Sequence, residues 1–196
     1  MTSPEVLRLV RPDDADEMAE VWRANREFLA PWEPVRDDAF FEPASQREAI
    51  ERSLVEHEAG RMVPFVICEP SGEIAGRLTL NGVTRGAFQS ASMGYWVRAD
   101  SNGRGLATRA ARQGVSHAFG TLGLHRLEAG TLLHNVASQT VLRRAGFRPF
   151  AVAPDYLRIA GRWQDHLLFH VFAPTTGPAP AEEQAAAGPE GGAGRQ

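Results

Sequence analysis

The chain has 196 residues, of which 43% are hydrophobic, and its formal net charge is −3. This length fits one domain with a packed core, and the acidic balance argues against a protein held on nucleic acid by phosphate contacts. Cys68 is the single cysteine, which excludes an intrachain disulfide and fits a reducing compartment. No apolar run approaches the roughly 18 residues of a membrane span, and no signal peptide is evident, so we expect a soluble, cytoplasmic protein.

The N-terminal part of the chain predicts a strand followed by a helix. Residues 6–10 have strand character, and Pro12 with two aspartates opens a helix whose apolar stripe runs to Leu29. Acidic side chains in the first turn are favoured there by the helix dipole. Pro31 ends this helix.

A second helix and a hairpin follow. Ser45 with Glu48 three residues later has the pattern of a capping box, which predicts a helix from Ser45 to Gly60. Two strand segments separated by a Ser-Gly turn predict an antiparallel hairpin, and they cover residues 63–68 and 74–83.

The second half alternates strands and helices. The expected elements are a strand at 92–98, a periodic helix from Leu106 to Leu122, a strand at 124–132, a short helix at 135–145, and strands at 147–152 and 162–172. Strands and helices mixed around one sheet indicate an α/β or α+β class. We expect one domain over residues 1–173. The Pro-, Gly- and Ala-rich tail at 174–196 lacks large apolar residues, and we expect it to be disordered.

A glycine-rich loop opens the helix that begins at Leu106. Gly103 and Gly105 let the backbone approach a ligand closely, and the first amides of a helix lack internal acceptors and attract negative charge. The amides from Gly103 to Thr108 therefore form a candidate phosphate cradle, with Arg104 at its rim. Tight-turn geometry alone is the alternative interpretation. No Lys-Ser/Thr pair follows, so the loop is not a P-loop.

Five separated motifs, read in order, resemble the GCN5-related N-acetyltransferase (GNAT) superfamily and its RimJ/RimL branch. They are Pro31-Trp32-Glu33-Pro34, Gly94-Tyr95-Trp96-Val97, Asn102-Gly103-Arg104-Gly105-Leu106-Ala107, Asn135-Val136-Ala137-Ser138 with Ala145-Gly146-Phe147, and Gly161-Arg162-Trp163-Gln164-Asp165-His166. The glycine-rich motif is similar to the loop that holds the coenzyme A pyrophosphate. One departure is Asn102, where the family usually has Arg or Gln.

The resemblance implies a mixed, mostly antiparallel central sheet flanked by helices, with splayed fourth and fifth strands. Acetyl-CoA is the implied cosubstrate, and its pantetheine arm lies between those strands. Along it we place Tyr95, Trp96 and Val97, whose amide is the expected oxyanion donor, while the loop from Asn102 to Thr108 and Asn135 complete the coenzyme site. No metal is expected.

Two catalytic residues are candidates. The resemblance implies that Ser138 protonates the coenzyme thiolate, although a serine near a helix start often only bonds the backbone. The fourth strand holds no acid, so Glu128 on the fifth strand is the best candidate base. A paired structural charge is the alternative for Glu128, and a water relay is a further possibility for the base. His125 and His134 are weaker choices.

The acceptor is less defined. The candidate substrate-binding residues are Trp32, Glu33 and Tyr156, together with Asp155. Asp155 and Tyr156 are expected in the connection before the last strand. The alternative for Glu33 is a surface turn, with Trp32 packing on the core. The expected reaction is acetyl transfer to an amine, foremost the N-terminal α-amino group of a protein. A small amine such as an antibiotic, polyamine or amino acid is the alternative acceptor, and a coenzyme-A-binding regulatory module without turnover is the alternative class. The expected state is a monomer or homodimer.

Overall fold

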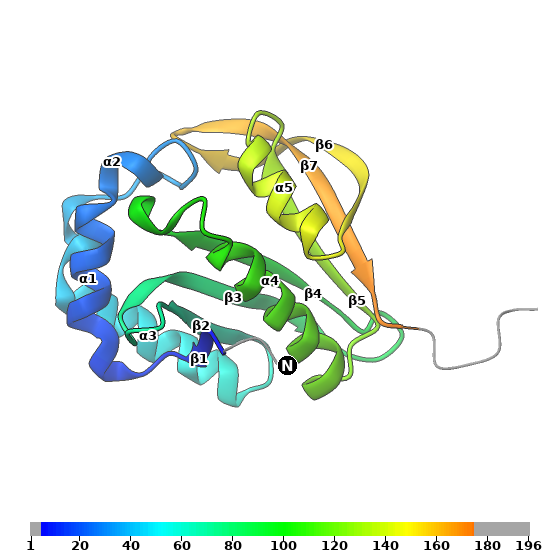
Figure 1. Ribbon diagram of the computed structural model, residues 1–196, viewed down its shortest axis with the longest axis horizontal. Helices are drawn as coiled ribbons and strands as arrows, with labels where there is room; N and C mark the ends of the chain where they lie inside the picture. Colours follow the sequence, from blue (N-terminus) through cyan, green and yellow to red (C-terminus); the bar gives the residue numbers. More distant parts are fainter. Residues whose placement is uncertain (1–4, 175–196) are drawn as a thin grey trace, which may run out of the picture.

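The computed structural model describes residues 5–174, which form one seven-stranded sheet with helices on both faces (Figure 1). The tail that the sequence predicts to be disordered lies outside these residues, apart from its first proline. No helix within residues 5–174 is long and apolar enough to cross a membrane.

The strands are arranged in the order β1-β2-β3-β4-β5-β7-β6. Neighbouring strands are antiparallel except β4 and β5, which are parallel. Their bounds are Leu7–Leu9 for β1, Val63–Cys68 for β2, Ile74–Thr84 for β3, Ser90–Val97 for β4, Arg126–Leu132 for β5, Arg148–Ile159 for β6 and Arg162–Phe172 for β7. The predicted β2–β3 hairpin is confirmed.

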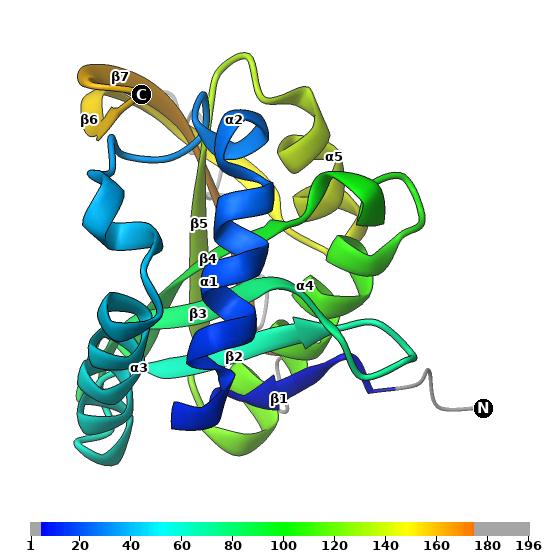
Figure 2. The same ribbon diagram turned by 90° about the vertical axis from the view of Figure 1, so that its left-hand side faces the viewer.

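The helices form one layer on each side of the sheet (Figure 2). They are α1 (Ala15–Ala24), α2 (Arg26–Leu29), α3 (Pro43–Glu58), α4 (Leu106–Ser116) and α5 (Val136–Arg144). Short turns of 3-10 helix cover Pro12–Asp14, Asp38–Phe41 and Ala99–Ser101, and a π-helical turn, His117–Thr121, extends α4. The main core cluster packs α4 and α5 on one face, and a second cluster packs α1 and α3 on the other. Alternate strand residues therefore belong to different cores.

The predicted helix from Pro12 to Leu29 is interrupted at Asn25. This buried side chain donates to the Val21 carbonyl at 2.8 Å and accepts from the Ala99 amide at 2.8 Å. These bonds satisfy a polar group inside the core and tie the helix to the chain after β4. The helix is consequently divided into α1 and α2.

Two local predictions are wrong. Helix α3 begins at Pro43, after Glu42, and not at a Ser45 capping box, because proline is pre-organised for the first position of a helix. Asp155 and Tyr156 lie within β6 and not in the connection before the last strand. The pairing of β6 with β7 is irregular between Ala153 and Leu157, and this bulge contains both residues.

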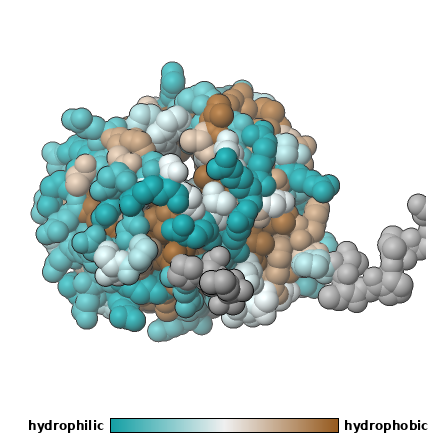
Figure 3. Space-filling model, viewed as in Figure 1, coloured by the Kyte–Doolittle hydropathy of each residue, from teal (hydrophilic) through white to brown (hydrophobic). Residues whose placement is uncertain are grey.

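The fourth and fifth strands separate as expected. β4 and β5 pair only where Ser90–Ser92 lies beside Arg126–Glu128, although both strands continue beyond that point. In the space-filling view the surface is hollowed between the start of α4 and α5 (Figure 3). The splay leaves one side of β4 without a neighbouring strand.

Candidate active site

The glycine-rich loop before α4 is shaped by two left-handed residues. Gly103 and Gly105 have φ angles of 75° and 79°, a region that disfavours side chains. A Cβ at either position would meet nothing within 4 Å, so conformation and not crowding requires glycine. The Arg109 amide donates to the Gly105 carbonyl at 3.0 Å. The amides of Leu106, Ala107 and Thr108 precede that bond and have no acceptor within the helix.

The loop's polar side chains are engaged within the protein. Arg104 pairs with Glu69 at 2.7 Å, and the Asn102 side-chain amide donates to the Arg98 carbonyl at 3.1 Å. Neither group is free to define an anion site by itself. The backbone amides at the start of α4 are therefore the donors of this loop that are not engaged within the helix.

The amide of Val97 points into the splay. Val97 lies opposite Gly76 in the β3–β4 ladder, and the Arg98 amide donates to the Ala75 carbonyl at 2.7 Å. This pattern makes Val97 and Gly76 a non-hydrogen-bonded pair, so the Val97 amide is directed away from β3. Tyr95 has the same orientation because strand geometry repeats every two residues. The amides of both residues therefore face the side on which β5 is no longer paired with β4.

Helix α5 borders the splay on its other side. The Asn135 side-chain oxygen accepts from the Ser138 amide at 3.0 Å and caps the helix. The Ser138 hydroxyl contacts the Tyr95 hydroxyl at 2.9 Å, so two predicted site residues 43 positions apart are brought together. Burial raises the pKa of Tyr95 to about 12, which keeps its phenol protonated near neutral pH. Trp96 differs, because its ring packs on Trp22 at 4.3 Å, on the opposite face of the sheet.

Glu128 lies on the β5 face opposite Leu127 and Ala129, which belong to the main core. Its half-buried carboxylate pairs with Arg126 at 2.5 Å, which is the paired-charge arrangement considered from the sequence. Of the two histidine options, His125 has its ring 5.4 Å from that of Phe172, which the Arg126 guanidinium also faces, and His134 has its ring 5.5 Å from that of Trp32.

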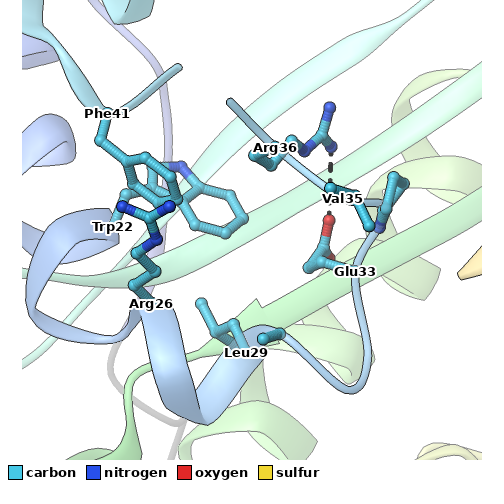
Figure 4. Close-up of a pocket in the computed structure, with 9 residues that line it drawn as sticks. Trp22, Arg26, Leu29, Glu33, Val35, Arg36 and Phe41 are labelled. Atoms are coloured by element: carbon cyan, nitrogen blue, oxygen red, sulfur yellow. Dashed lines mark hydrogen bonds and ion pairs between the residues drawn. The ribbon is translucent and has the colours of Figure 1, made fainter. Parts of the chain in front are cut away.

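Glu33 lies in the wall of a cavity of about 210 Å³ that α1, α2 and the following loop enclose (Figure 4). Its carboxylate is 3.4 Å from Arg36. Burial raises the pKa of Glu33, and Arg36 opposes that rise. The Glu33 carbonyl also accepts from the Ala160 amide at 2.9 Å, which joins this loop to the β6–β7 turn.

The other two acceptor candidates lie on neighbouring segments. The Trp32 ring is 5.5 Å from that of His134, just before α5, and the Tyr156 ring is 5.4 Å from that of His166 on β7. Both pairs place aromatic groups next to the segments that border the splay.

Sequence reasoning did not identify a second cleft, of about 320 Å³, on the α1 side of the sheet. Trp22 and Arg77 line it, with Tyr95 and Trp96 at its β4 edge. The alternation of β3 places Arg77, Thr79 and Asn81 on one face, and this was the signal available in the sequence.

Comparisons with known proteins agree with this geometry. A sequence profile of an acetyltransferase (GNAT) domain matches residues 6–148. The chain is 34% identical over 170 residues to [Ribosomal protein uS5]-alanine N-acetyltransferase of Escherichia coli K12, covering 86% of this chain and 88% of that protein.

Two solved structures extend the comparison. Mycobacterium smegmatis RimJ in complex with CoA-disulfide has a TM-score of 0.82 at 39% identity, covering 85% of this chain and 81% of that one. The ribosomal-protein-S5-alanine acetyltransferase of Vibrio fischeri has a TM-score of 0.82 at 30% identity, covering 87% and 95%. With its splayed strands and glycine-rich loop, the chain belongs to the GNAT family of acetyltransferases.

Proposed function

We propose that this enzyme transfers the acetyl group of acetyl-CoA to the N-terminal α-amino group of a protein, with an alanine-initiated ribosomal protein as the foremost acceptor. The proposed acetyl transfer is supported above all by the splay between β4 and β5, where the Val97 amide and the Ser138 hydroxyl border one opening. The acceptor class is supported by the similarity to the uS5-alanine enzyme. We propose further that the enzyme acts in the cytoplasm, as one domain over residues 1–173 and as a monomer or homodimer.

The donor substrate fits the splay and the glycine-rich loop. Its pyrophosphate takes the amides from Gly103 to Thr108, where the backbone supplies donors and the α4 dipole adds attraction. Its pantetheine arm extends along Tyr95 to Val97 as a strand would. The Asn135 side-chain nitrogen is available to the arm, because the oxygen of that side chain caps α5.

The chemistry needs a donor, an acid and a base. A neutral amine attacks the thioester carbonyl, and the Val97 amide stabilises the oxyanion that forms. Collapse of the tetrahedral intermediate breaks the carbon–sulfur bond, and Ser138 supplies a proton to the departing thiolate. Glu128 is the proposed acceptor of the amine proton through water. The ion pair with Arg126 fixes the position of the Glu128 carboxylate, so the proposed role depends on that pair.

The acceptor approaches from the Glu33 side. The Glu33 carboxylate attracts a cationic α-ammonium, and Trp32 and Tyr156 are the proposed aromatic contacts of the acceptor. The bond between the Glu33 carbonyl and Ala160 fixes the loop relative to the β6–β7 turn.

One experiment tests the whole proposal. Binding of acetyl-CoA is measured by calorimetry, and thiol release is then followed with peptides that begin with Ala, Ser or Met and with spermidine. We expect binding, with release fastest for the alanine peptide. Release with spermidine alone would move the function to small amines. Binding without release on any acceptor would favour a regulatory role.

A further inference from the structure

The second cleft is lined by Trp22, Arg77 and Trp96 among others. It lies on the α1 side of the sheet, at the same stretch of β4 whose backbone borders the splay. Glu33 lies in its wall as well as in the wall of the 210 Å³ cavity. A group bound here is therefore adjacent to both the proposed ammonium site and the reacting end of the donor.

Two residues that line this cleft each carry a buried hydrogen-bond donor without a partner. Within residues 5–174, the indole Nε1 of Trp22 and the Nε of Arg77 are buried without an acceptor. Trp22 is 5% exposed. Another nitrogen of the Arg77 guanidinium donates to the Ser53 hydroxyl at 2.9 Å, which fixes its position. Buried donors without partners are rare in native proteins and call for an explanation.

The charges of the cleft favour an oxygen ligand. Arg36 is paired with Glu33, whereas no carboxylate of the described chain lies within ion-pair distance of Arg77. Burial lowers the pKa of Arg77, and nearby Glu33 opposes that change. A buried cation of this kind is stabilised by a carbonyl or carboxylate oxygen.

We propose that Arg77 and Trp22 bind the carbonyl or carboxylate oxygen next to the acceptor's α-amine. Glu33 lines the same cleft and attracts the amine, so one α-amino acid unit can contact both the carboxylate and the two donors. The enzyme then selects amines derived from α-amino acids, either peptide termini or free amino acids, over alkyl amines and polyamines. This inference rests on the proposed function and adds the basis of its selectivity.

The test compares three acceptors with similar carbon skeletons. Alaninamide carries an amide carbonyl, alanine carries a carboxylate, and sec-butylamine carries neither. The measured quantity is the selectivity ratio, defined as kcat/KM for alaninamide divided by kcat/KM for sec-butylamine. Alanine as a better substrate than alaninamide would identify a free carboxylate, and the reverse would identify a peptide carbonyl, as the oxygen that is bound.

The variant is Arg77→Met, with Arg52→Met on the exposed surface of α3 as the matched control. We expect Arg77→Met to lower the selectivity ratio by about 10- to 100-fold, since a hydrogen bond to a charged group is lost. Arg52→Met should leave the ratio unchanged. If Arg77 only supported the sheet, Arg77→Met would lower kcat/KM equally for both acceptors. A selectivity ratio that is unchanged in Arg77→Met therefore overturns the inference.

A second variant, Trp22→Phe, tests the inference if Arg77→Met does not fold. Trp22→Phe removes the indole Nε1 and keeps an aromatic ring, and we expect it to lower the same ratio by several-fold. No effect of either variant on the ratio contradicts the proposal. Equal use of alaninamide and sec-butylamine by the wild-type enzyme overturns the inference alone, whereas no transfer to any amine overturns the proposed function itself.

Discussion

Replacing Ser138 by alanine removes one hydroxyl from the border of the splay. That hydroxyl contacts the Tyr95 hydroxyl at 2.9 Å, and the same phenol is 3.2 Å from the Ser138 carbonyl. The phenol therefore keeps an acceptor in the variant. We expect the free energy of unfolding to fall by about 1 kcal/mol or less, which is the net value of one hydrogen bond.

The effect of Ser138→Ala on turnover should be much larger than its effect on stability. General acid catalysis contributes about 10²- to 10⁴-fold. Tyr95, with its pKa of about 12, remains a protonated phenol next to the lost hydroxyl and can supply part of the missing donor. The expected loss in kcat is therefore at the low end, about 100-fold. Affinity for acetyl-CoA should change little, because the role lies in departure of the thiolate.

The assay pairs thiol release with calorimetric binding of acetyl-CoA. Thr140→Ala is the matched control on the same helix, since the Thr140 hydroxyl donates to the Val136 carbonyl at 2.8 Å. Tyr95→Phe tests whether the Tyr95 hydroxyl replaces the lost proton donor. Combined with Ser138→Ala, it should lower kcat further than Ser138→Ala alone. An unchanged kcat in Ser138→Ala, or a loss of coenzyme affinity equal to the loss of kcat, would refute the role of Ser138 as an acid.

Two further predictions concern the loop and the N-terminal ion pair. Gly105→Ala should lower the free energy of unfolding by about 1 kcal/mol, because φ at this position is positive, and it should weaken acetyl-CoA binding. Gly86→Ala is the matched control: Gly86 lies in the β3–β4 turn with φ 70° and equally open space, so this variant should lose the same stability without any effect on binding. Denaturant melts measure the stability and calorimetry measures the binding. Burial would raise the pKa of Asp14, but Arg8 at 2.7 Å and the Arg11 amide at 2.7 Å lower it below the usual 3.8. Because the pKa of Asp14 is lower in the folded state, its carboxylate stabilises the fold above pH 3.8, and this contribution is lost as the pH falls through the folded-state pKa. Asp14→Asn should therefore lower the free energy of unfolding by about 1.5–3 kcal/mol at pH 7 and by progressively less below about pH 4. A difference that stays constant down to pH 2 would contradict this account.

Local patterns in the sequence determined much of the framework. The two glycines of the loop, the β2–β3 hairpin and the periodic helix from Leu106 all follow from short-range chemistry, since each depends on residues a few positions apart. The resemblance supplied the splay, which periodicity alone does not encode. Helix ends were less certain, as the start of α3 at Pro43 shows, because competing cap signals lie within a few residues.

Tertiary structure decided how these parts act together. The contact between Tyr95 and Ser138, the pairing of Glu128 with Arg126, and the buried cation Arg77 beside Trp22 depend on which strands become neighbours and where they part. The break at Asn25 likewise depends on a bond to Ala99, 74 positions away. Sequence patterns report the face on which a residue lies, because periodicity is local. They do not report its partner across the core, because that depends on the packing of segments distant along the chain.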